Sequence, residues 1–341
     1  MFGNVMAIER ALGTGIIISS SVPISQRVQK RIRAFVEEYE QTLSRFRADS
    51  LVSRMARAEH GGEFEFPAWA RPLFALYSEF YAATRGAFDA CIGADLLALG
   101  YNNSVQFVPE SAASASSNIG SWSNYRRALP VTWSDISRDS GSATLCTNQP
   151  VQLDFGAAGK GYFVDLVTQI IKEELGSDSP ADFDFLVNAG GDMRVCFSEE
   201  NDQIKAALEN PFDTTQAVAV ASIASGALCA SSSARKRWKV KDASCLGKDA
   251  SGFESNLIAT HLINALDGIP ACDLCASWAY VPSKTCDFPT AYADALATAL
   301  FVSQESDLQK IVQTTSAEFA VISPNHALRK TRAFPAHFFA D

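Results

Sequence analysis

The segment GAAGKG, residues 156–161, places three glycines and one lysine between an apolar stretch and a helical pattern. Glycines let backbone N–H groups turn toward an anion, and the positive end of a following helix favours phosphate. Lys160 adds a full positive charge. The segment fits neither the Walker pattern, because Gly161 follows the lysine, nor the GxGxxG pattern of dinucleotide-binding turns. It therefore predicts either a phosphate-binding turn or an ordinary turn from strand to helix.

A second polar turn, NAGGD at residues 188–192, directly follows an apolar strand pattern. Paired glycines beside Asn and Asp are typical of a tight turn. The same residues also suit the close approach of a ligand, with amides and a carboxylate as polar contacts. Both interpretations stay open at this point.

The helical pattern at residues 293–302, ADALATALFV, carries Asp294 and Thr298 four residues apart and hence on one face. A carboxylate and a hydroxyl are hard oxygen ligands, which suit Mg²⁺ beside a bound phosphate. The alternative is a solvated face with an acid near the positive end of the helix.

Three further groups of residues could carry chemistry. His261, in THLIN, could serve as a general base for a hydroxyl or be a structural histidine. The basic residues of ASSSARKRWKVK, 230–241, are typical of a solvated strand or loop. Cys272 and Cys275 form a CxxC pair near Cys286, but no nearby residue completes a zinc site, so reduced thiols are favoured.

The elements that must position these residues follow from hydrophobic spacing. Helical periodicity predicts helices from residue 25 to about 46, over 69–80, from about 162 to a stop at Gly176, and from Pro289 onward. Apolar runs predict strands at residues 13–20, 151–155, 183–187, 204–208 and 218–224. Because helices and strands alternate without a regular βαβ rhythm, the fold class is predicted as α+β. The small polar residues 111–124 predict an exposed insertion loop within one domain.

Composition narrows the class of protein. The chain has 341 residues, 47% of them hydrophobic, and a net charge of −9, which suits a globular protein and argues against a nucleic-acid partner. No apolar run is long enough for a membrane span, and the start of the chain lacks a leader pattern or a lipid-bearing cysteine. A cytoplasmic location is therefore expected.

The order of the motifs along the chain carries more information than any one of them. The succession LGT, SRFRADS, GAFDACIG, LDFGAAGKGYFVD, VNAGGDMR, HLIN and ADALATALFV resembles the ApbE-type flavin transferases, the FAD:protein FMN transferases. The match extends from about Leu12 to Val302. The resemblance implies a T-fold-like arrangement of antiparallel sheets and packed helices, with a ligand cleft between two subdomains and one domain over residues 12–335.

The resemblance also implies an activity. Members of this family bind FAD and a divalent cation, usually Mg²⁺, and transfer FMN to a threonine hydroxyl of an acceptor flavoprotein, releasing AMP. Some members hydrolyse FAD to FMN and AMP instead. An FAD pyrophosphatase and a flavin-binding protein without turnover therefore remain as alternatives.

Carried over residue by residue, the resemblance implies a set of site residues. The cation ligands would be the Ala157 carbonyl, the Asp294 carboxylate and the Thr298 hydroxyl, and His261 would be the base. The expected FAD-binding residues are Leu12, Phe46, Ala87, Phe88, Asp89, Lys160, Asp165, Asn188, Gly190, Gly191, Asp192 and Ile263.

Two segments depart from the family pattern. Where the family has His-Ile-Ile-Asp-Pro, this chain has HLINA, with Asn264 and Ala265 at the last two positions. Where the family has Ala-Thr-Ser-Gly-Asp-Tyr, residues 230–235 are ASSSAR. Both departures leave the implied cation ligands unchanged and bear instead on recognition of the acceptor and the nucleoside.

Overall fold

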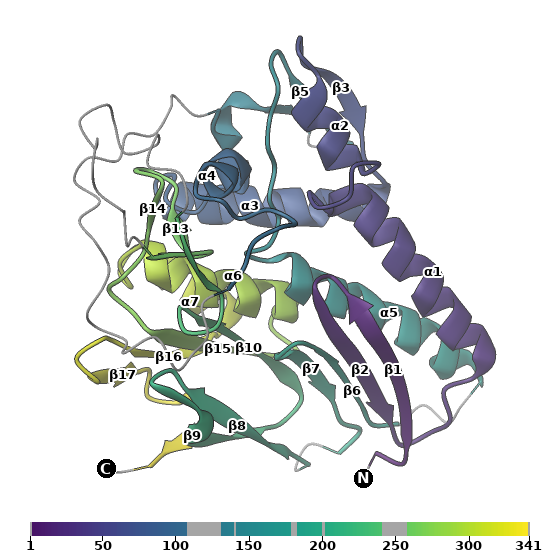
Figure 1. The fold of residues 1–341 in the computed structure, drawn as a ribbon. Helices are drawn as coiled ribbons and strands as arrows, with labels where there is room; N and C mark the ends of the chain where they lie inside the picture. Colours follow the sequence, from purple (N-terminus) through teal and green to yellow (C-terminus); the bar gives the residue numbers. More distant parts are fainter. Residues whose placement is uncertain are drawn as a thin grey trace.

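A computed structural model describes residues 2–107, 131–139, 141–178, 183–199, 202–240 and 258–339. The predicted insertion loop 111–124 lies outside these residues. The centre of the fold is an eight-stranded antiparallel sheet in the order β1-β2-β6-β7-β10-β15-β16-β17 (Figure 1). Its strands are β1 (Asn4–Ala11), β2 (Thr14–Ser20), β6 (Phe185–Ala189), β7 (Asp192–Cys196), β10 (Gly226–Ser232), β15 (Ala276–Pro282), β16 (Glu318–Ile322) and β17 (Leu328–Lys330). The predicted α+β class with antiparallel sheets is confirmed.

Helices cover one face of this sheet in two layers. The inner layer consists of α5 (Gly159–Asp178), against β6 and β7, and α6 (Pro289–Val302), against β10 and β15. The outer layer includes α1 (Gln26–Leu43) over α5 and α3 (Arg71–Ala83) over α6 (Figure 1). The other helices are α2 (Leu51–Arg57), α4 (Gly93–Ala98), α7 (Gln309–Thr315) and the 3₁₀ turns η1 (Ala68–Ala70), η2 (Ala90–Ile92) and η4 (Trp133–Asp135).

Smaller sheets complete the fold. A three-stranded sheet, β18-β9-β8, packs its apolar residues on the opposite face of the main sheet and forms a second core with side chains such as Trp278 and Ile322. The remaining strands form the sheets β3-β5-β4, β11-β12 and β13-β14. Their bounds, with those of the second core, are β3 (Gly62–Glu65), β4 (Ser137–Arg138), β5 (Thr144–Thr147), β8 (Ile204–Asn210), β9 (Asp213–Ile223), β11 (Arg237–Lys239), β12 (Ile258–Thr260), β13 (Ile263–Asn264), β14 (Ile269–Pro270) and β18 (Ala336–Phe338).

Helix α6 is buried on almost every side because α5, α3, β10 and β15 surround it. An apolar helix without a polar face is what such a position requires. Alanines dominate its sequence, and they allow the neighbouring elements to approach closely. A carboxylate in this helix, Asp294, is therefore held in the interior, where it needs partners.

Two predicted elements differ from the structure. Residues 151–155 alternate between buried and half-buried side chains as a strand would, but they pair with loops: the Asp154 N–H donates to the Ala90 carbonyl at 2.7 Å. They form an extended segment outside every sheet. Helix α5 begins at Gly159, earlier than predicted, because the Gly159 N–H already bonds to the Phe155 carbonyl at 2.7 Å. It also continues past Gly176, where a stop was predicted.

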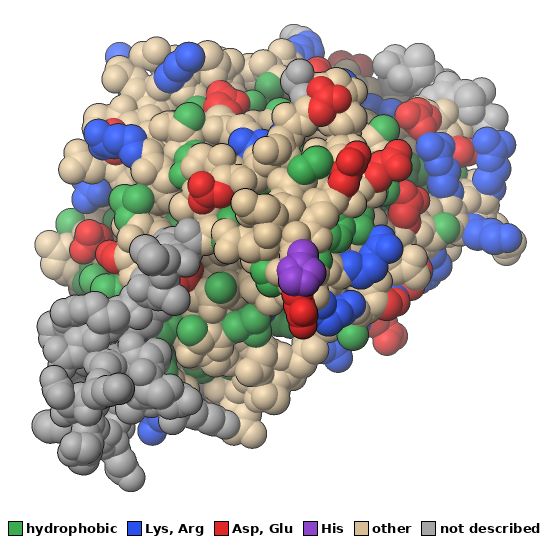
Figure 2. Space-filling view, turned by 90° about the horizontal axis from the view of Figure 1, so that it is seen from above, with side chains coloured by type: hydrophobic (Ala, Val, Ile, Leu, Met, Phe, Trp, Pro, Cys, Tyr) green, Lys and Arg blue, Asp and Glu red, His purple; other side chains and the backbone are tan. Residues whose placement is uncertain are grey.

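The distribution of charge on the surface and the character of the helices can be compared with the predictions about partners. On the face seen in Figure 2, basic and acidic side chains of the described residues are interspersed, without a continuous basic patch. Among the described residues, none of the helices combines the length and the apolar character needed to cross a membrane.

Candidate functional site

The turn before α5 is held by a buried ion pair. The Asp154 carboxylate accepts the Gly156 N–H at 2.6 Å and the Arg45 Nε–H at 2.5 Å. The same guanidinium donates to the Tyr101 carbonyl at 3.0 Å and lies 4.2 Å from the centre of the Phe46 ring. Arg45 therefore ties the end of α1 to the segment that carries Ala157.

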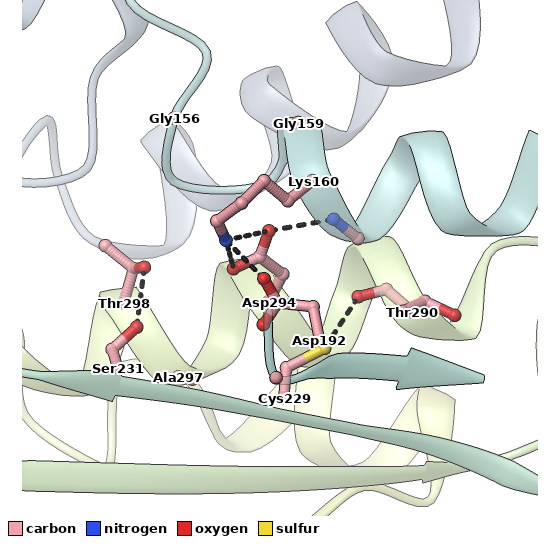
Figure 3. A network of polar contacts seen from close by, with 12 residues as sticks. Gly156, Gly159, Lys160, Asp192, Cys229, Ser231, Thr290, Asp294, Ala297 and Thr298 are labelled. Carbon is pink, nitrogen blue, oxygen red and sulfur yellow. Dashed lines mark hydrogen bonds and ion pairs between the residues drawn. The ribbon is translucent and has the colours of Figure 1, made fainter. Parts of the chain in front are cut away.

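Lys160 and two carboxylates form the polar centre of the molecule (Figure 3). The Lys160 ammonium contacts the Asp192 carboxylate and lies 3.4 Å from Asp294 Oδ1. The Gly161 N–H donates to Asp294 Oδ2 at 2.9 Å. Both carboxylates are 3% exposed. One ammonium thus faces two buried carboxylates, and the trio carries an excess negative charge.

The pKa values reflect this arrangement. Burial, and then the charge of Asp192, raise the pKa of Asp294 to about 7. Burial opposes the charged form of Lys160, but the charges of Asp192 and Asp294 outweigh it and raise the pKa of the ammonium. A carboxylate that ionises only near neutrality in the absence of a further cation is typical of a functional site.

The other implied cation ligands lie on the adjoining elements. The Thr298 and Ser231 hydroxyls are 3.2 Å apart, one turn along α6 from Asp294. Figure 3 shows the segment from Gly156 to Gly159, which includes Ala157, passing beside Lys160 and Asp294. Within the described ranges, no three His, Cys, Asp or Glu side chains gather to hold a metal. A set that uses one carboxylate, one hydroxyl and one carbonyl would not form such a group.

Gly161 allows α5 and α6 to approach closely at this centre. A Cβ at this position would lie 2.2 Å from the Thr290 carbonyl oxygen and 2.7 Å from Asp294 Cβ. Gly159, two residues earlier in the same helix, has only ordinary contacts, the nearest at 3.5 Å from the Tyr39 hydroxyl oxygen. The two glycines therefore differ in what a side chain would disturb.

We expect Gly161→Ala to lower the free energy of unfolding by about 3 kcal/mol, because the contacted atoms are mainly backbone and cannot move aside. Gly159→Ala is the matched control and should change stability by less than about 1 kcal/mol, since alanine favours a helix. Urea denaturation of both variants measures the difference. If Gly161→Ala were as stable as Gly159→Ala, α5 and α6 could move apart without loss of stability, and the prediction would be wrong.

Asp165 holds the start of α6. Its carboxylate accepts the Thr290 hydroxyl at 2.6 Å, the Thr290 N–H at 3.2 Å and the Ala291 N–H at 2.9 Å. These bonds occupy a side chain that is 3% exposed. The residue expected to bind FAD thus has its carboxylate directed at the helix that carries Asp294. Its contribution to the site is to position that helix.

Burial raises the pKa of Asp165 from 3.8 to about 6, against the opposing effects of Arg194 and the hydrogen bonds. The native carboxyl therefore binds its proton more tightly than the unfolded chain does, and stability falls as pH rises from about 4 to 6. Asp165→Asn lacks this titrating group. Between pH 4.5 and 6.5 the free energy of unfolding of wild type should therefore fall by about 2 kcal/mol more than that of the variant. Urea denaturation at both pH values measures it.

Asp213→Asn is the control for this pH experiment. Relative to this variant, the free energy of unfolding of wild type should fall as pH is lowered, which is the opposite direction. Hydrogen bonds from Thr215 lower the pKa of Asp213, so its stabilising effect is lost as pH falls. A wild-type minus Asp165→Asn difference that stays constant with pH would contradict the raised pKa of Asp165.

The NAGGD segment forms the hairpin turn between β6 and β7. Gly190 and Gly191 have φ of +66° and +105°, and Ala189 pairs with Asp192 across the turn. The Asn188 side-chain oxygen accepts the Gly191 N–H at 2.9 Å. The glycines and Asn188 therefore shape a tight turn, while Asp192, as the first residue of β7, reaches Lys160.

The other residues expected to contact FAD are spread over several environments. Ala87 and Phe88 are buried in the main core, and Ile263 is buried beside α4. The Asp89 carboxylate accepts the Cys91 N–H at 2.7 Å. Phe46 is 41% exposed. Leu12 is half-buried, and its N–H donates to the Glu40 carboxylate at 2.7 Å.

His261 follows β12 and is half-buried. Burial, and then the charges of Lys236 and Lys160, hold the pKa of His261 well below its usual range. The side chain is therefore a neutral imidazole whose buried Nδ1 has no hydrogen-bond partner among the described residues. The charge of Lys160, which belongs to the polar centre, thus acts on His261 as well.

Several residues of this region are not among the site residues predicted from the sequence. Arg45, Tyr101 and Trp238 form a ladder beside Asp154, with the Tyr101 and Trp238 rings stacked at 4.9 Å between centres. The Asp-x-Gly pattern at Asp154 is a turn signal that could have indicated its bond to Gly156. Arg45 lies in the quoted motif SRFRADS, which does not indicate its partner, and for Tyr101 and Trp238 the sequence offers no local signal.

The cysteines and the expected ligand cleft are separate from this polar centre in the structure. Cys272 is exposed, Cys275 is buried and Cys286 is half-buried, and all three are free thiols. Surface hollows of about 370 and 460 Å³ lie along α1, and Lys160, Asp192 and Asp294 line neither of them. The ligand cleft between two subdomains therefore stays a prediction.

Comparison with known proteins agrees with the motif order. The model of the ApbE family matches residues 12–322. Similar solved structures include the ApbE protein of Thermotoga maritima (18% identity, TM-score 0.70, covering 97% of this chain and 98% of that one). The flavinyl transferase ApbE of Pseudomonas stutzeri has 21% identity, a TM-score of 0.64 and coverage of 98% and 97%.

The flavin transferase ApbE of Vibrio cholerae is also similar, with 16% identity, a TM-score of 0.65 and coverage of 96% of both chains. No curated protein sequence gives a significant match. At these identities the solved structures establish the fold, and the family model, which covers most of the sequence, establishes the relationship. The chain belongs to the ApbE family.

Proposed function

We propose that this protein is a flavin transferase that moves FMN from FAD to a threonine hydroxyl of an acceptor flavoprotein, with Mg²⁺ as cofactor. The observation that carries the proposal is the buried trio of Lys160, Asp192 and Asp294, which has an excess negative charge beside a backbone turn. Family membership and the names of the similar structures support the flavin substrate.

The residues present suit a divalent cation. Burial, and then the charge of Asp192, raise the pKa of Asp294 to about 7, and a cation beside this carboxyl would favour its ionised form. The Ala157 carbonyl and the hydroxyl of Thr298 are neutral oxygen donors, which Mg²⁺ accepts readily alongside a carboxylate. When bound, the cation would neutralise phosphate oxygens during phosphoryl transfer.

The chain's own residues have distinct roles in this proposal. The Lys160 ammonium and the N-terminus of α5 attract the phosphates of FAD. The ion pair of Arg45 and Asp154 fixes the turn that precedes this helix. The threonine oxygen bonds to the phosphorus of FMN as the pyrophosphate P–O bond breaks, and AMP keeps the bridging oxygen. His261, with a free imidazole nitrogen, accepts the proton of the threonine hydroxyl.

The first experiment is to add FAD with and without Mg²⁺ and to measure AMP by chromatography. We expect AMP only when the cation is present, and EDTA should abolish it. A protein that binds FAD without forming AMP would be a flavin-binding protein, and the proposal would be wrong.

A second experiment separates transfer from hydrolysis. The protein is co-expressed with candidate flavoproteins, and each acceptor is examined by intact mass and by flavin fluorescence after denaturation. Transfer predicts one covalent FMN that disappears when the target threonine is replaced by valine. Rapid AMP formation without any labelled acceptor would instead identify an FAD pyrophosphatase.

A further inference from the structure

Lys236 stands out within the basic segment that the sequence predicts as a solvated strand or loop. Arg235 pairs with Glu209 at the surface, and its side chain is 60% exposed. Lys239 is exposed. Lys236 is half-buried, and no described carboxylate lies within ion-pair distance of its ammonium. This lysine is therefore partly shielded from water, and the described residues give it no carboxylate partner.

The backbone shows where Lys236 lies. The segment follows β10, whose last residue is Ser232, and the hydroxyl of Ser231 within that strand is 3.2 Å from that of Thr298. It then enters β11, where Arg237 pairs with Thr260 of the antiparallel strand β12. Lys236 and His261 lie just outside these paired residues, and the backbone of Lys236 hydrogen-bonds with the His261 side chain. The segment thus spans the site, from a proposed cation ligand to the proposed base.

The charges that act on Lys236 belong to the same centre. Burial, and then the positive charge of Lys160, lower the pKa of Lys236, while Asp154, Asp192 and Asp294 oppose this effect. His261 in turn senses Lys236 more strongly than it senses Lys160. The charges of the buried trio therefore act on the Lys236 ammonium.

The net charge of the site with its expected ligands indicates a role for Lys236. With both carboxylates ionised, the trio of Lys160, Asp192 and Asp294 carries one net negative charge, and a divalent cation would leave it with one positive charge. A pyrophosphate brings two negative charges, so a bound dinucleotide would leave one negative charge uncompensated. A second ammonium at the rim of the centre removes this imbalance.

We propose that Lys236 binds the pyrophosphate of the dinucleotide donor, as a second cation beside Lys160. This inference rests on the proposed function and adds a contact from the segment in which the chain departs from its family pattern. The ligand it selects is a phosphoanhydride, because an uncharged ring system would gain little from an ammonium at this position.

The test compares Lys236→Met, which keeps the length of the side chain, with Lys239→Met, an exposed neighbour on β11. Dissociation constants for FAD and riboflavin are measured by flavin fluorescence in EDTA and again with Mg²⁺. Loss of a charge-assisted hydrogen bond should weaken FAD binding by about 10- to 100-fold in Lys236→Met. Riboflavin binding should change by less than about twofold, and Lys239→Met should match wild type for both ligands.

Lys236→Arg keeps the charge and should restore most of the FAD affinity. If Lys236→Met binds FAD as tightly as wild type does, or if FAD and riboflavin weaken equally, the inference is wrong while wild-type AMP formation still supports the proposed function. If wild type neither binds FAD nor forms AMP, the proposed function fails and this inference fails with it. Circular dichroism of each variant verifies that the comparison is between folded proteins.

Discussion

Replacing Asp294 by alanine is expected to lower AMP formation from FAD by about 10³-fold or more and to remove its dependence on Mg²⁺. Asp294 is the one charged group among the proposed cation ligands Ala157, Asp294 and Thr298. A carbonyl and a hydroxyl alone hold Mg²⁺ weakly, because hard cations depend on charged oxygen ligands. Steady-state AMP formation across a range of Mg²⁺ concentrations measures the effect.

The fold should survive this change. The Gly161 N–H loses its acceptor, at a cost of about 1–3 kcal/mol, but the repulsion between Asp192 and Asp294 disappears as well. Asp294→Asn separates charge from shape, because the amide oxygen can still accept that N–H. It should therefore be as inactive as alanine but more stable.

The matched control is Asp273→Ala, which removes an exposed aspartate and should leave AMP formation unchanged. The assignment of Asp294 would be overturned if Asp294→Asn formed AMP at the wild-type rate with the same Mg²⁺ dependence. A loss of activity with unchanged Mg²⁺ dependence would place the residue outside the cation site.

Sequence alone predicts those parts of the fold that depend on local patterns. Pro289 and the apolar run after it indicate α6, and the paired glycines of NAGGD indicate the turn that delivers Asp192. Residues 151–155 show where this approach fails. Their alternating burial is that of a strand, but whether a strand has a neighbour in a sheet depends on residues far away in the chain.

The candidate site shows the same division. Lys160, Asp192 and Asp294 could be singled out from motifs, but their mutual contact brings together residues that are up to 134 positions apart. The pair of Arg45 and Asp154 spans 109 positions and has no local signature. Asp165 was expected to bind FAD because it lies in the motif, whereas its carboxylate meets the start of α6. Motif membership identifies a residue as important and leaves its contact undetermined.

Replacing His261 by alanine is expected to lower FMN transfer to the acceptor by about 10²- to 10⁴-fold while FAD affinity stays within about twofold. The imidazole is held neutral by burial, Lys236 and Lys160, and its buried Nδ1 has no hydrogen-bond partner among the described residues. Single-turnover transfer at saturating FAD measures the loss, and equilibrium binding of FAD measures the affinity. His337→Ala, at an exposed histidine of β18, is the control and should leave both unchanged.

The pH dependence identifies the role more sharply than the loss of rate does. A histidine with a pKa well below 6.5 remains a competent base in mildly acidic solution, so wild-type transfer should stay constant from pH 8 down to 6.5 and decline only below that. Lys236→Met removes a charge that depresses the pKa of His261. At saturating FAD, it should therefore move the decline to higher pH. If His261→Ala keeps the wild-type rate at every pH, or if the decline does not move in Lys236→Met, the proton is accepted by another group.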